Sequence, residues 1–249
     1  MASYRRASMC NLYHVTPKSD FATYMARQAA RWVIPDYEMR TVGPNQDGVF
    51  FRAGGEGVIG QVGQWGLIRP GQPERIDYLP SKIPGKRGRP RSTNNARIEG
   101  IEKKMTFKAA WASGRRWLVP AAWYQEPNWE TGKNIWWQLK RADGEPWMLA
   151  GLWSEWTDLK TGELVPNFTM LTTNCDSHPL LKRLHKPDPE LAPDAQDKRS
   201  LAHIDPSNWD RWLRGTIDEA MQLIVPPPLD AFDPADAVRT DEALTALRR

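Results

Sequence analysis

Apolar residues along the chain fall mostly into short runs that are separated by glycine, proline and polar turns. Runs of this length that are rich in β-branched and aromatic residues predict strands. We expect strands at 10–15, 49–51, 58–68, 117–125, 134–140, 147–156 and 167–173. Because these segments cluster in the middle of the chain and do not alternate with helices, they predict an α+β fold. We expect a single domain with an antiparallel, barrel-like β core flanked by helices.

Helical spacing of apolar residues marks the segments around this core. The first such stripe predicts a helix that turns one face to the core with Phe21, Tyr24, Met25, Ala29 and Trp32. Ser19 or Asp20 can cap its start. Further helical signals occur at 98–111, 178–184, 208–213 and 216–223.

The length of 249 residues is enough for one large domain with its own core. We expect a leader at residues 1–8, one domain at 9–225 and a tail at 226–249 that starts at a proline triplet. The tail is polar with weak helical turns, so we expect a peripheral helix or partial disorder there.

Cysteine usage limits the classes of site. Cys10 and Cys175 are the only two cysteines, which is too few for a disulfide framework or a four-cysteine zinc site. We therefore expect no metal and no cofactor, and a reducing compartment. No run approaches the roughly 18 apolar residues of a membrane span. These features predict a cytoplasmic protein, associated with the nucleoid if the source is bacterial, and no membrane partner.

Positive charge is concentrated in one segment. Six basic residues and no acidic residue lie between Ser81 and Arg97, so the rest of a chain with net charge +4 is slightly acidic. Such a segment fits a confined phosphate-binding surface, although a solvated loop is the simpler interpretation. It also contains Arg-Gly-Arg-Pro at 87–90, the core of a minor-groove AT-hook.

Five motifs in a fixed order carry a resemblance to a known family. They are Met9-Cys10-Asn11-Leu12-Tyr13, Trp65-Gly66-Leu67-Ile68, Asn95-Ala96-Arg97-Ile98-Glu99, Leu118-Val119-Pro120-Ala121 through Glu126, and Phe168–Thr173 followed by Leu180–His185. In this order they resemble the SOS response-associated peptidase family over residues 9 to about 213. Between Ala121 and Glu126 the sequence departs from the family pattern, which leaves Glu130 as an alternative to Glu126.

The resemblance implies a DNA-damage protein whose reactive group is an N-terminal cysteine. With a free α-amino group, Cys10 is an aminothiol that can close a thiazolidine ring on the aldehyde of an abasic site in single-stranded DNA. The amine, with a pKa of about 8, and the thiol, with a pKa of about 8.5, are both partly nucleophilic at neutral pH. This chemistry requires removal of residues 1–9, either by a translation start at Met9 or by self-cleavage.

The resemblance also assigns roles around Cys10. Glu126 is the expected proton donor and shuttle, and His185 is expected to position the sugar or assist imine formation. Asn95 is expected to bond the Cys10 backbone or the opened sugar. Arg97 is expected to hold a phosphate, with an internal ion pair to a carboxylate such as Glu99 as the alternative.

Single-strand binding needs basic groups along the backbone and rings that stack on bases. The expected DNA-binding residues are therefore Arg97, the basic residues Lys86, Arg87, Arg89 and Arg91, and the rings of Trp65 and Trp123. The expected partner is single-stranded DNA with abasic sites, bound by a monomer.

Two other functions remain open. The first is a thiol peptidase or autopeptidase with Cys10 as nucleophile, His185 as base and Asn95 as orienting residue. This activity tolerates an acylated Cys10 nitrogen, whereas thiazolidine formation does not. The second is a non-catalytic DNA-binding module built on the basic segment, whose binding is insensitive to Cys10→Ala.

Overall fold

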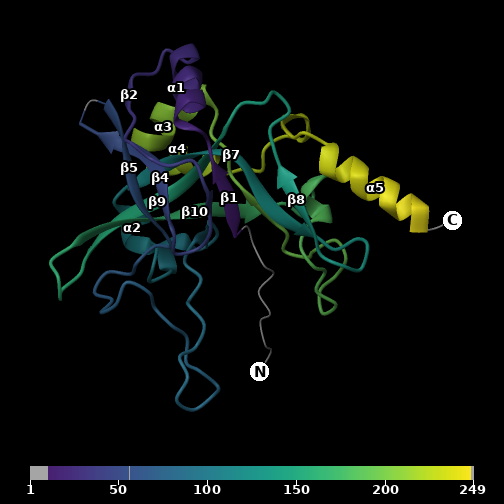
Figure 1. Cartoon of the computed structure of the whole chain (residues 1–249), viewed down its shortest axis with the longest axis horizontal. Helices are drawn as coiled ribbons and strands as arrows, with labels where there is room; N and C mark the ends of the chain where they lie inside the picture. The colour runs from purple at the N-terminus through teal and green to yellow at the C-terminus, as the bar shows by residue number, and fades with distance from the viewer. Residues whose placement is uncertain (1–10, 56, 248–249) are drawn as a thin grey trace.

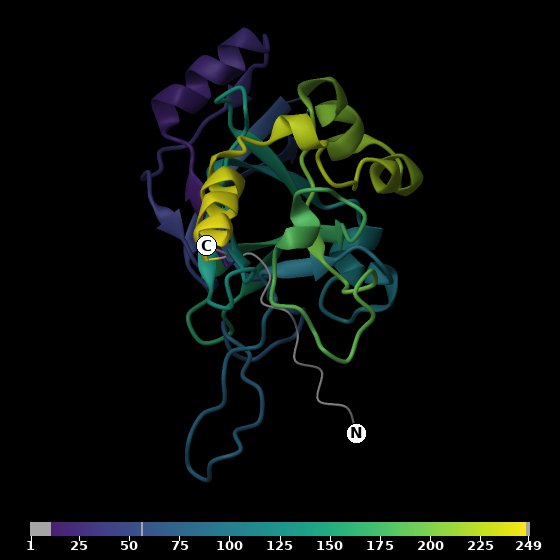
Figure 2. The same ribbon diagram turned by 90° about the vertical axis from the view of Figure 1, so that its right-hand side faces the viewer.

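The computed structural model describes residues 11–55 and 57–247, and its central feature is a closed barrel of five strands (Figure 1). The strands are β4 (Asp47–Gly54), β5 (Gly57–Trp65), β7 (Arg116–Asn128), β9 (Trp147–Thr157) and β10 (Leu164–Asn174). Each pairs with the next in the order β5, β4, β7, β9, β10, and β10 returns to β5. Figure 2 shows the strands surrounding a common axis. The predicted single α+β domain with a barrel-like core is confirmed.

One pairing in the barrel departs from the predicted antiparallel pattern. β5 and β10 run parallel, with Asn167 opposite Gln64 and Phe168 opposite Trp65. The reason is topological, because strand direction can alternate all the way around a closed ring only if the number of strands is even. A ring of five strands must contain at least one parallel pair.

Shorter strands extend the barrel sheet. They are β1 (Leu12–Val15) on β7, β3 (Thr41–Val42) on β1, β2 (Trp32–Val33) on β5, β8 (Ile135–Leu139) on β7, and β6 (Asn95–Arg97) and β11 (Arg199–Leu201) on β10. β6 runs parallel to β10, whereas β11 runs antiparallel to it. β10 therefore joins the barrel to the two short strands that carry Arg97 and Arg199.

Aromatic rings fill the barrel. Trp117 meets Phe168 edge-on with ring centroids 4.9 Å apart, and Phe50 lies 5.3 Å from Phe168. Strands can approach closely here because Gly151 lacks a side chain: a Cβ atom at this position would lie 2.1 Å from the Thr169 carbonyl oxygen. The high tryptophan content is thus used largely in the core.

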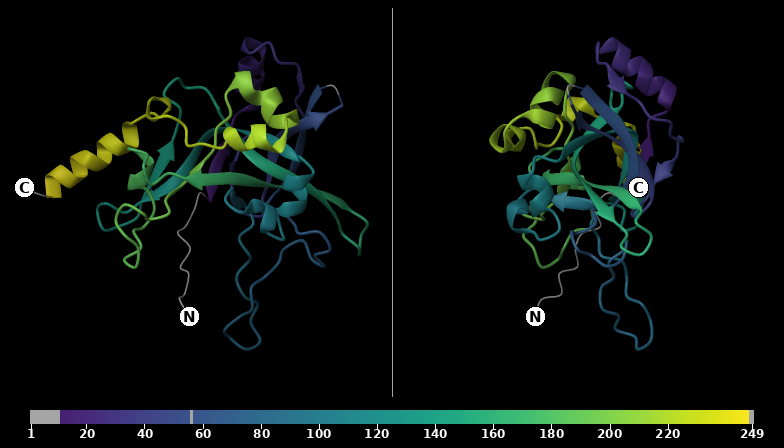
Figure 3. Two further views of the ribbon diagram at one scale, coloured as in Figure 1. Left: turned by 180° about the vertical axis from the view of Figure 1, so that it is seen from behind. Right: turned by 90° about the vertical axis from the view of Figure 1, so that its left-hand side faces the viewer.

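Helices lie around the outside of the barrel (Figure 3). The helices of the described residues are α1 (Lys18–Arg27), α2 (Lys108–Ala112), α3 (Trp209–Arg214), α4 (Ile217–Gln222) and α5 (Ala235–Leu247), with 3-10 turns at Ile101–Lys103, Leu181–Arg183, Pro206–Asn208 and Leu229–Ala231. α1 and α3 meet through the rings of Tyr24 and Trp209, and the Trp212 indole N–H donates to the Trp117 carbonyl at 2.9 Å. None of the helices in the described part of the chain has the length and apolar character that a membrane span requires.

Two local predictions were tested by these elements. The apolar face of α1 is confirmed for Phe21, Tyr24 and Met25, which are buried. The rest of this prediction is wrong. Ala29 and Trp32 lie beyond the end of the helix at Arg27, and the helix begins after Pro17 without a side-chain cap from Ser19 or Asp20. The expected helix over 98–111 is wrong: Gly100 has a φ of 67° and interrupts the segment, leaving one 3-10 turn and the short α2. Glycine adopts this left-handed conformation without the steric cost that a side chain brings.

The segment after the proline triplet contains a packed helix. The Trp137 indole N–H donates to the Thr240 hydroxyl at 2.9 Å, and Arg183 forms an ion pair with Asp241 at 2.6 Å. These contacts fasten α5 to β8 and to the turn before His185. Residues 235–247 are therefore a peripheral helix attached by specific polar contacts.

Candidate functional site

Glu126 and His185 form a buried pair at the end of β7. The Nε2 atom of His185 lies 2.9 Å from Oε2 of Glu126, and their side chains are 1% and 4% exposed respectively. The two residues are brought together by an isolated bridge between Asn128 and Leu184. The structure therefore joins two of the residues that the sequence singled out for proton transfer.

The backbone of His185 is held in an unusual conformation. Its φ is 62°, in the left-handed region that residues with side chains rarely adopt. Its N–H donates to the Pro127 carbonyl at 2.6 Å. The ammonium of buried Lys198 donates to the carbonyls of Leu184 and His185 at 2.6 and 2.8 Å. These contacts, which we call the His185 clamp, orient the imidazole toward Glu126.

The hydrogen bond relates the tautomer of His185 to the charge of Glu126. When Glu126 is ionised, its carboxylate oxygen can only accept, so Nε2 of His185 is then the N–H donor. The other nitrogen, Nδ1, is buried and has no hydrogen-bond partner among the described residues. In the neutral ring Nδ1 is then the basic nitrogen, which can accept a proton from a group that enters the site.

Asn11 connects this pair to the strand that carries Asn95. Leu12 of β1 lies opposite Gln125 of β7, so one step further along each strand come Asn11 and Glu126. The side-chain amide of Asn94 donates to Oδ1 of Asn11 at 3.3 Å, directly before Asn95. Cys10 lies outside the described residues. Asn11, the residue that follows Cys10 in the chain, nevertheless lies beside β7 and contacts Asn94, just before β6. Asn95 itself is buried on β6.

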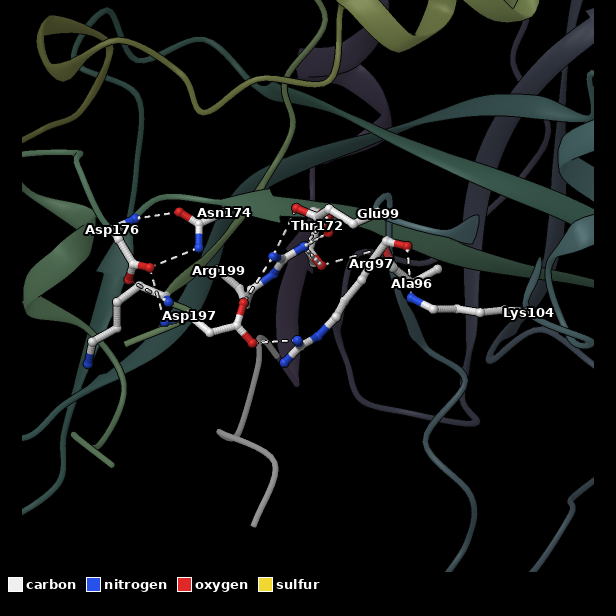
Figure 4. Close-up of polar contacts among 10 residues, drawn as sticks. Ala96, Arg97, Glu99, Lys104, Thr172, Asn174, Asp176, Asp197 and Arg199 are labelled. Carbon is white, nitrogen blue, oxygen red and sulfur yellow. Dashed lines mark hydrogen bonds and ion pairs between the residues drawn. The ribbon is translucent and has the colours of Figure 1, made fainter. Parts of the chain in front are cut away.

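Arg97 belongs to a cluster of paired charges (Figure 4). It forms an ion pair with Asp197, which also lies 3.2 Å from Nη1 of Arg199. Arg199 is buried and pairs with Glu99 at 2.6 Å. In this conformation Arg97 therefore forms an internal ion pair, which was the alternative to phosphate binding. Its partner is Asp197, whereas Glu99 pairs with Arg199.

The basic segment projects from the barrel as a two-stranded loop (Figure 1). Leu79 N–H donates to the Arg89 carbonyl at 2.9 Å, and Arg91 N–H donates to the Asp77 carbonyl at 2.8 Å. Gly88 allows this pairing, since a Cβ there would lie 1.8 Å from the Leu79 carbonyl oxygen. One edge of the Arg-Gly-Arg-Pro stretch is therefore occupied by the opposite strand.

Two of the four basic site candidates in this loop are already paired. Arg87 contacts Glu74 at 2.8 Å and covers the Tyr78 ring at 4.3 Å, and Arg91 contacts Asp77 at 2.7 Å. The other two candidates, Lys86 and Arg89, are exposed and form no ion pair among the described residues. Their charged groups are therefore open to solvent and available for contact with an anion.

The two tryptophan candidates lie in different environments. Trp65 is 0% exposed, and its indole N–H donates to the Asn94 carbonyl at 2.8 Å, so in this conformation its ring presents no face to a base. Trp123 is half-buried and stacks on His14, with ring centroids 5.1 Å apart and planes 7° apart. One face of Trp123 is therefore covered by a residue of β1.

Glu130, the alternative to Glu126, pairs with Arg183 at 2.9 Å, so the carboxylate that meets His185 is that of Glu126.

Cys175 was not anticipated from the sequence as a residue of this region. Burial, followed by the negative charges of Glu126 and Asp176, raises the pKa of the Cys175 thiol to about 12. Cys175 consequently stays protonated at neutral pH. Its position near Glu126 could not be inferred from motif spacing.

Residues 197–199 were also missed, although each contacts a part of the candidate site. Asp197 meets Arg97, Lys198 meets the His185 carbonyl, and Arg199 meets Glu99. Three consecutive charged residues are a weak signal, since such runs are usually solvated. As for metal ions, the described ranges contain no group of three or more His, Cys, Asp or Glu residues that could hold one.

Fold and site together define a barrel protein with a buried acid–base pair beside a cluster of arginine–carboxylate pairs. The chain belongs to the SOS response associated peptidase (SRAP) family, whose model matches residues 6–239. Membership supports a role in the DNA-damage response. It also suggests DNA binding and an enzymatic or DNA-processing activity.

Solved structures of similar proteins support the fold. A protein from Bordetella bronchiseptica is 28% identical with a TM-score of 0.72, and the match covers 90% of this chain and 97% of that chain. A protein from Bacteroides thetaiotaomicron is 20% identical with a TM-score of 0.64, covering 89% of this chain and 90% of that chain. A phage-related protein from Bordetella bronchiseptica is 16% identical with a TM-score of 0.58, covering 90% and 92%. No curated protein sequence matches the chain.

Proposed function

We propose that the chain forms a covalent thiazolidine crosslink between Cys10 and abasic sites in single-stranded DNA, after removal of residues 1–9. The observation that carries the proposal is the buried hydrogen bond of 2.9 Å between His185 and Glu126, next to the strand that leads to Cys10. A histidine held by a carboxylate in a buried site is suited to proton transfer.

The chemistry balances without a cofactor. The α-amine of Cys10 adds to the aldehyde carbon of the opened sugar, and loss of one water gives an imine. The thiolate then adds to the imine carbon, and the nitrogen takes up a proton, which closes the five-membered ring. Proton transfer is needed at the sugar oxygen, at the departing water and at the ring nitrogen. His185 and Glu126 are the residues we assign to these transfers.

DNA binding is assigned to two surfaces. Arg97 borders the site, and Lys86 and Arg89 extend from the projecting loop without an ion-pair partner in the described chain. Arg87 and Arg91 are assigned a second function besides phosphate contact, because their ion pairs hold the loop together. A groove of basic groups that follows the backbone is a common basis of single-strand binding.

The test uses a chain that begins at Met9, so that methionine removal exposes Cys10. It is incubated with an oligonucleotide that contains one abasic position, and the product is examined on a denaturing gel and by intact mass. The expected product has the summed mass of protein and DNA minus one water. Cys10→Ser and a chain with an acetylated Cys10 amine are expected to give no crosslink.

His185→Gln tests the assignment of the proton-transfer pair. We expect it to slow crosslinking about 100-fold, in the range usual for general acid–base catalysis, with DNA affinity unchanged. His14→Gln is the matched control, because His14 is partly exposed and contacts Thr41 and Trp123. Equal rates for His185→Gln and the wild type, with folding verified by circular dichroism, would contradict the assignment.

The same pair favours a second function, a thiol peptidase. A cysteine nucleophile needs a histidine base oriented by a third group, and Glu126 can serve as that group in place of the expected Asn95. The two functions are separated by the acetylated protein. Peptidase activity persists when the Cys10 amine is acetylated, whereas thiazolidine formation is lost.

A further inference from the structure

Two arginines from different strands converge on one carboxylate at the edge of the site. Arg97 comes from β6 and Arg199 from β11, and both contact Asp197 (Figure 4). The side chains of Arg97 and Asp197 are 34% and 39% exposed, whereas that of Arg199 is 3% exposed. The Asp197 carboxylate thus closes the solvent side of a two-arginine site.

The backbone at Asp197 is fixed independently of these arginines. Its N–H and that of Lys198 donate to the two carboxylate oxygens of Asp176, at 3.0 and 2.8 Å. Its φ of 54° lies in the left-handed region, which aspartate and asparagine tolerate better than most residues. Because the main chain is anchored, the side chain can turn toward solvent while the loop stays in place.

The second arginine does not depend on Asp197 for its charge balance. Glu99 contacts Arg199 at 2.6 and 3.1 Å, and the Thr172 carbonyl accepts a further bond from it at 2.8 Å. Release of Asp197 therefore leaves Arg199 paired. Arginine binds the oxygens of carboxylates and phosphates with the same planar geometry. The position of the Asp197 carboxylate is chemically suited to a phosphodiester.

We propose that Asp197 is a built-in competitor for a DNA phosphate, which takes the position between Arg97 and Arg199 when the Asp197 side chain turns away. This inference rests on the proposed binding of DNA at the same site. It adds Asp197 and Arg199 to that site and describes its regulation. The competitor weakens binding to intact DNA, whereas an abasic strand is retained by its covalent bond.

The test measures equilibrium binding to an undamaged single-stranded oligonucleotide, so that crosslinking does not contribute. Asp197→Asn removes the charge and keeps the shape. A charge about 8 Å from a phosphate, at an effective dielectric constant of about 20, corresponds to a tightening of roughly threefold to thirtyfold at low salt. The salt dependence is expected to steepen by up to about 0.7, the increment of one extra phosphate contact on a single strand.

Asp194→Asn is the matched control. Asp194 is exposed, lies on the same loop three residues earlier, and forms no ion pair in the described part of the chain. It makes the same change in net charge, so binding is expected to change by less than about twofold. Equal tightening by both variants, or no tightening by Asp197→Asn, overturns the proposal. Neither result affects the crosslink, which is measured separately on abasic DNA.

Two further variants connect the effect to the arginine and to folding. In the double variant with Arg97→Gln, the gain from Asp197→Asn is expected to fall to less than about half, because the freed arginine is absent. A gain that is fully retained contradicts the assigned position of the phosphate. Asp197→Gly, which is compatible with a positive φ, serves as a second neutral variant if the asparagine form melts early.

Discussion

Lys198→Met tests the clamp that holds His185 in its left-handed conformation. The Lys198 ammonium donates to the carbonyls of Leu184 and His185 at 2.6 and 2.8 Å, and the residue is 6% exposed. Methionine has a similar length and apolar stem but no donor. The substitution therefore removes both hydrogen bonds and leaves two carbonyls in a site that water reaches poorly.

The expected magnitude comes from opposing contributions. Each hydrogen bond from a charged donor stabilises a fold by roughly 1.5–3 kcal/mol. The cost of burying an ammonium, which methionine avoids, offsets part of the sum. We expect a net loss of about 2–4 kcal/mol in the free energy of unfolding. In urea this shifts the midpoint of unfolding down by about 1 M, given a slope of about 2–3 kcal/mol per molar.

Lys182→Met is the control for the Lys198 experiment, because Lys182 is exposed on the 3-10 turn before His185. Its midpoint is expected to stay close to that of the wild type. Equal midpoints for the two variants would refute the clamp. We also expect Lys198→Met to slow crosslinking, since the imidazole of His185 loses its fixed position relative to Glu126.

The pH dependence of the same pair of proteins gives a second check. Burial lowers the pKa of Lys198 from its ordinary value of 10.5, and the negative charge of Asp176 opposes this effect only in part. Below pH 10.5 the unfolded chain then binds more protons at this group than the folded chain, so the contribution of Lys198 to stability rises with pH. The neutral amine keeps two N–H groups for the two carbonyls. The stability difference between wild type and Lys198→Met is expected to grow as pH approaches 10.5.

Two further predictions concern the barrel and the charge cluster. Gly151→Ala is expected to destabilise the fold by about 3 kcal/mol or more, because its Cβ would meet the Thr169 carbonyl of a neighbouring strand, whereas Gly57→Ala has room and serves as the control in the same urea titration. Burial raises the pKa of Glu99, but the hydrogen bond and charge of Arg199 outweigh it and hold the pKa below its ordinary 4.5. This stabilisation is present above pH 4.5 and lost as pH falls through the folded-state value. The Glu99→Gln variant is therefore expected to lose less free energy of unfolding than the wild type as the pH falls. Equal losses in the two proteins would contradict the assignment.

The barrel and the first helix could be predicted because burial leaves a periodic signal in the sequence. Phe21, Tyr24 and Met25 repeat at helical spacing, and all three face the core. The direction of strand pairing leaves no such signal. The parallel pair between β5 and β10 depends on the total number of strands in the ring, which no local pattern encodes.

The environment of single aromatic residues was harder to predict. Trp65 and Trp123 both lie in strand-like apolar runs, but one is fully buried and the other stacks on His14. A strand places alternate residues on opposite faces, and the sequence does not say which face is covered. Family resemblance identified both positions without identifying their surroundings.

The candidate site was located by motifs, but its contacts required the fold. Glu126 and His185 lie 59 positions apart, and their hydrogen bond depends on a bridge between β7 and the turn before His185. The pairing of Arg97 with Asp197 joins segments even farther apart. Contacts of this kind are set by strand register and loop course, so a single sequence cannot supply them.

The parallel pair that closes the barrel joins segments that are far apart along the chain. Gln64 and Asn167 come together only after about a hundred intervening residues have been accommodated, and such distant pairings form late because chain entropy opposes them. β6 and β11, with Arg97 and Arg199, both dock on β10. Barrel closure and the arginine cluster therefore both wait for β10, which is the last of the five barrel strands along the chain.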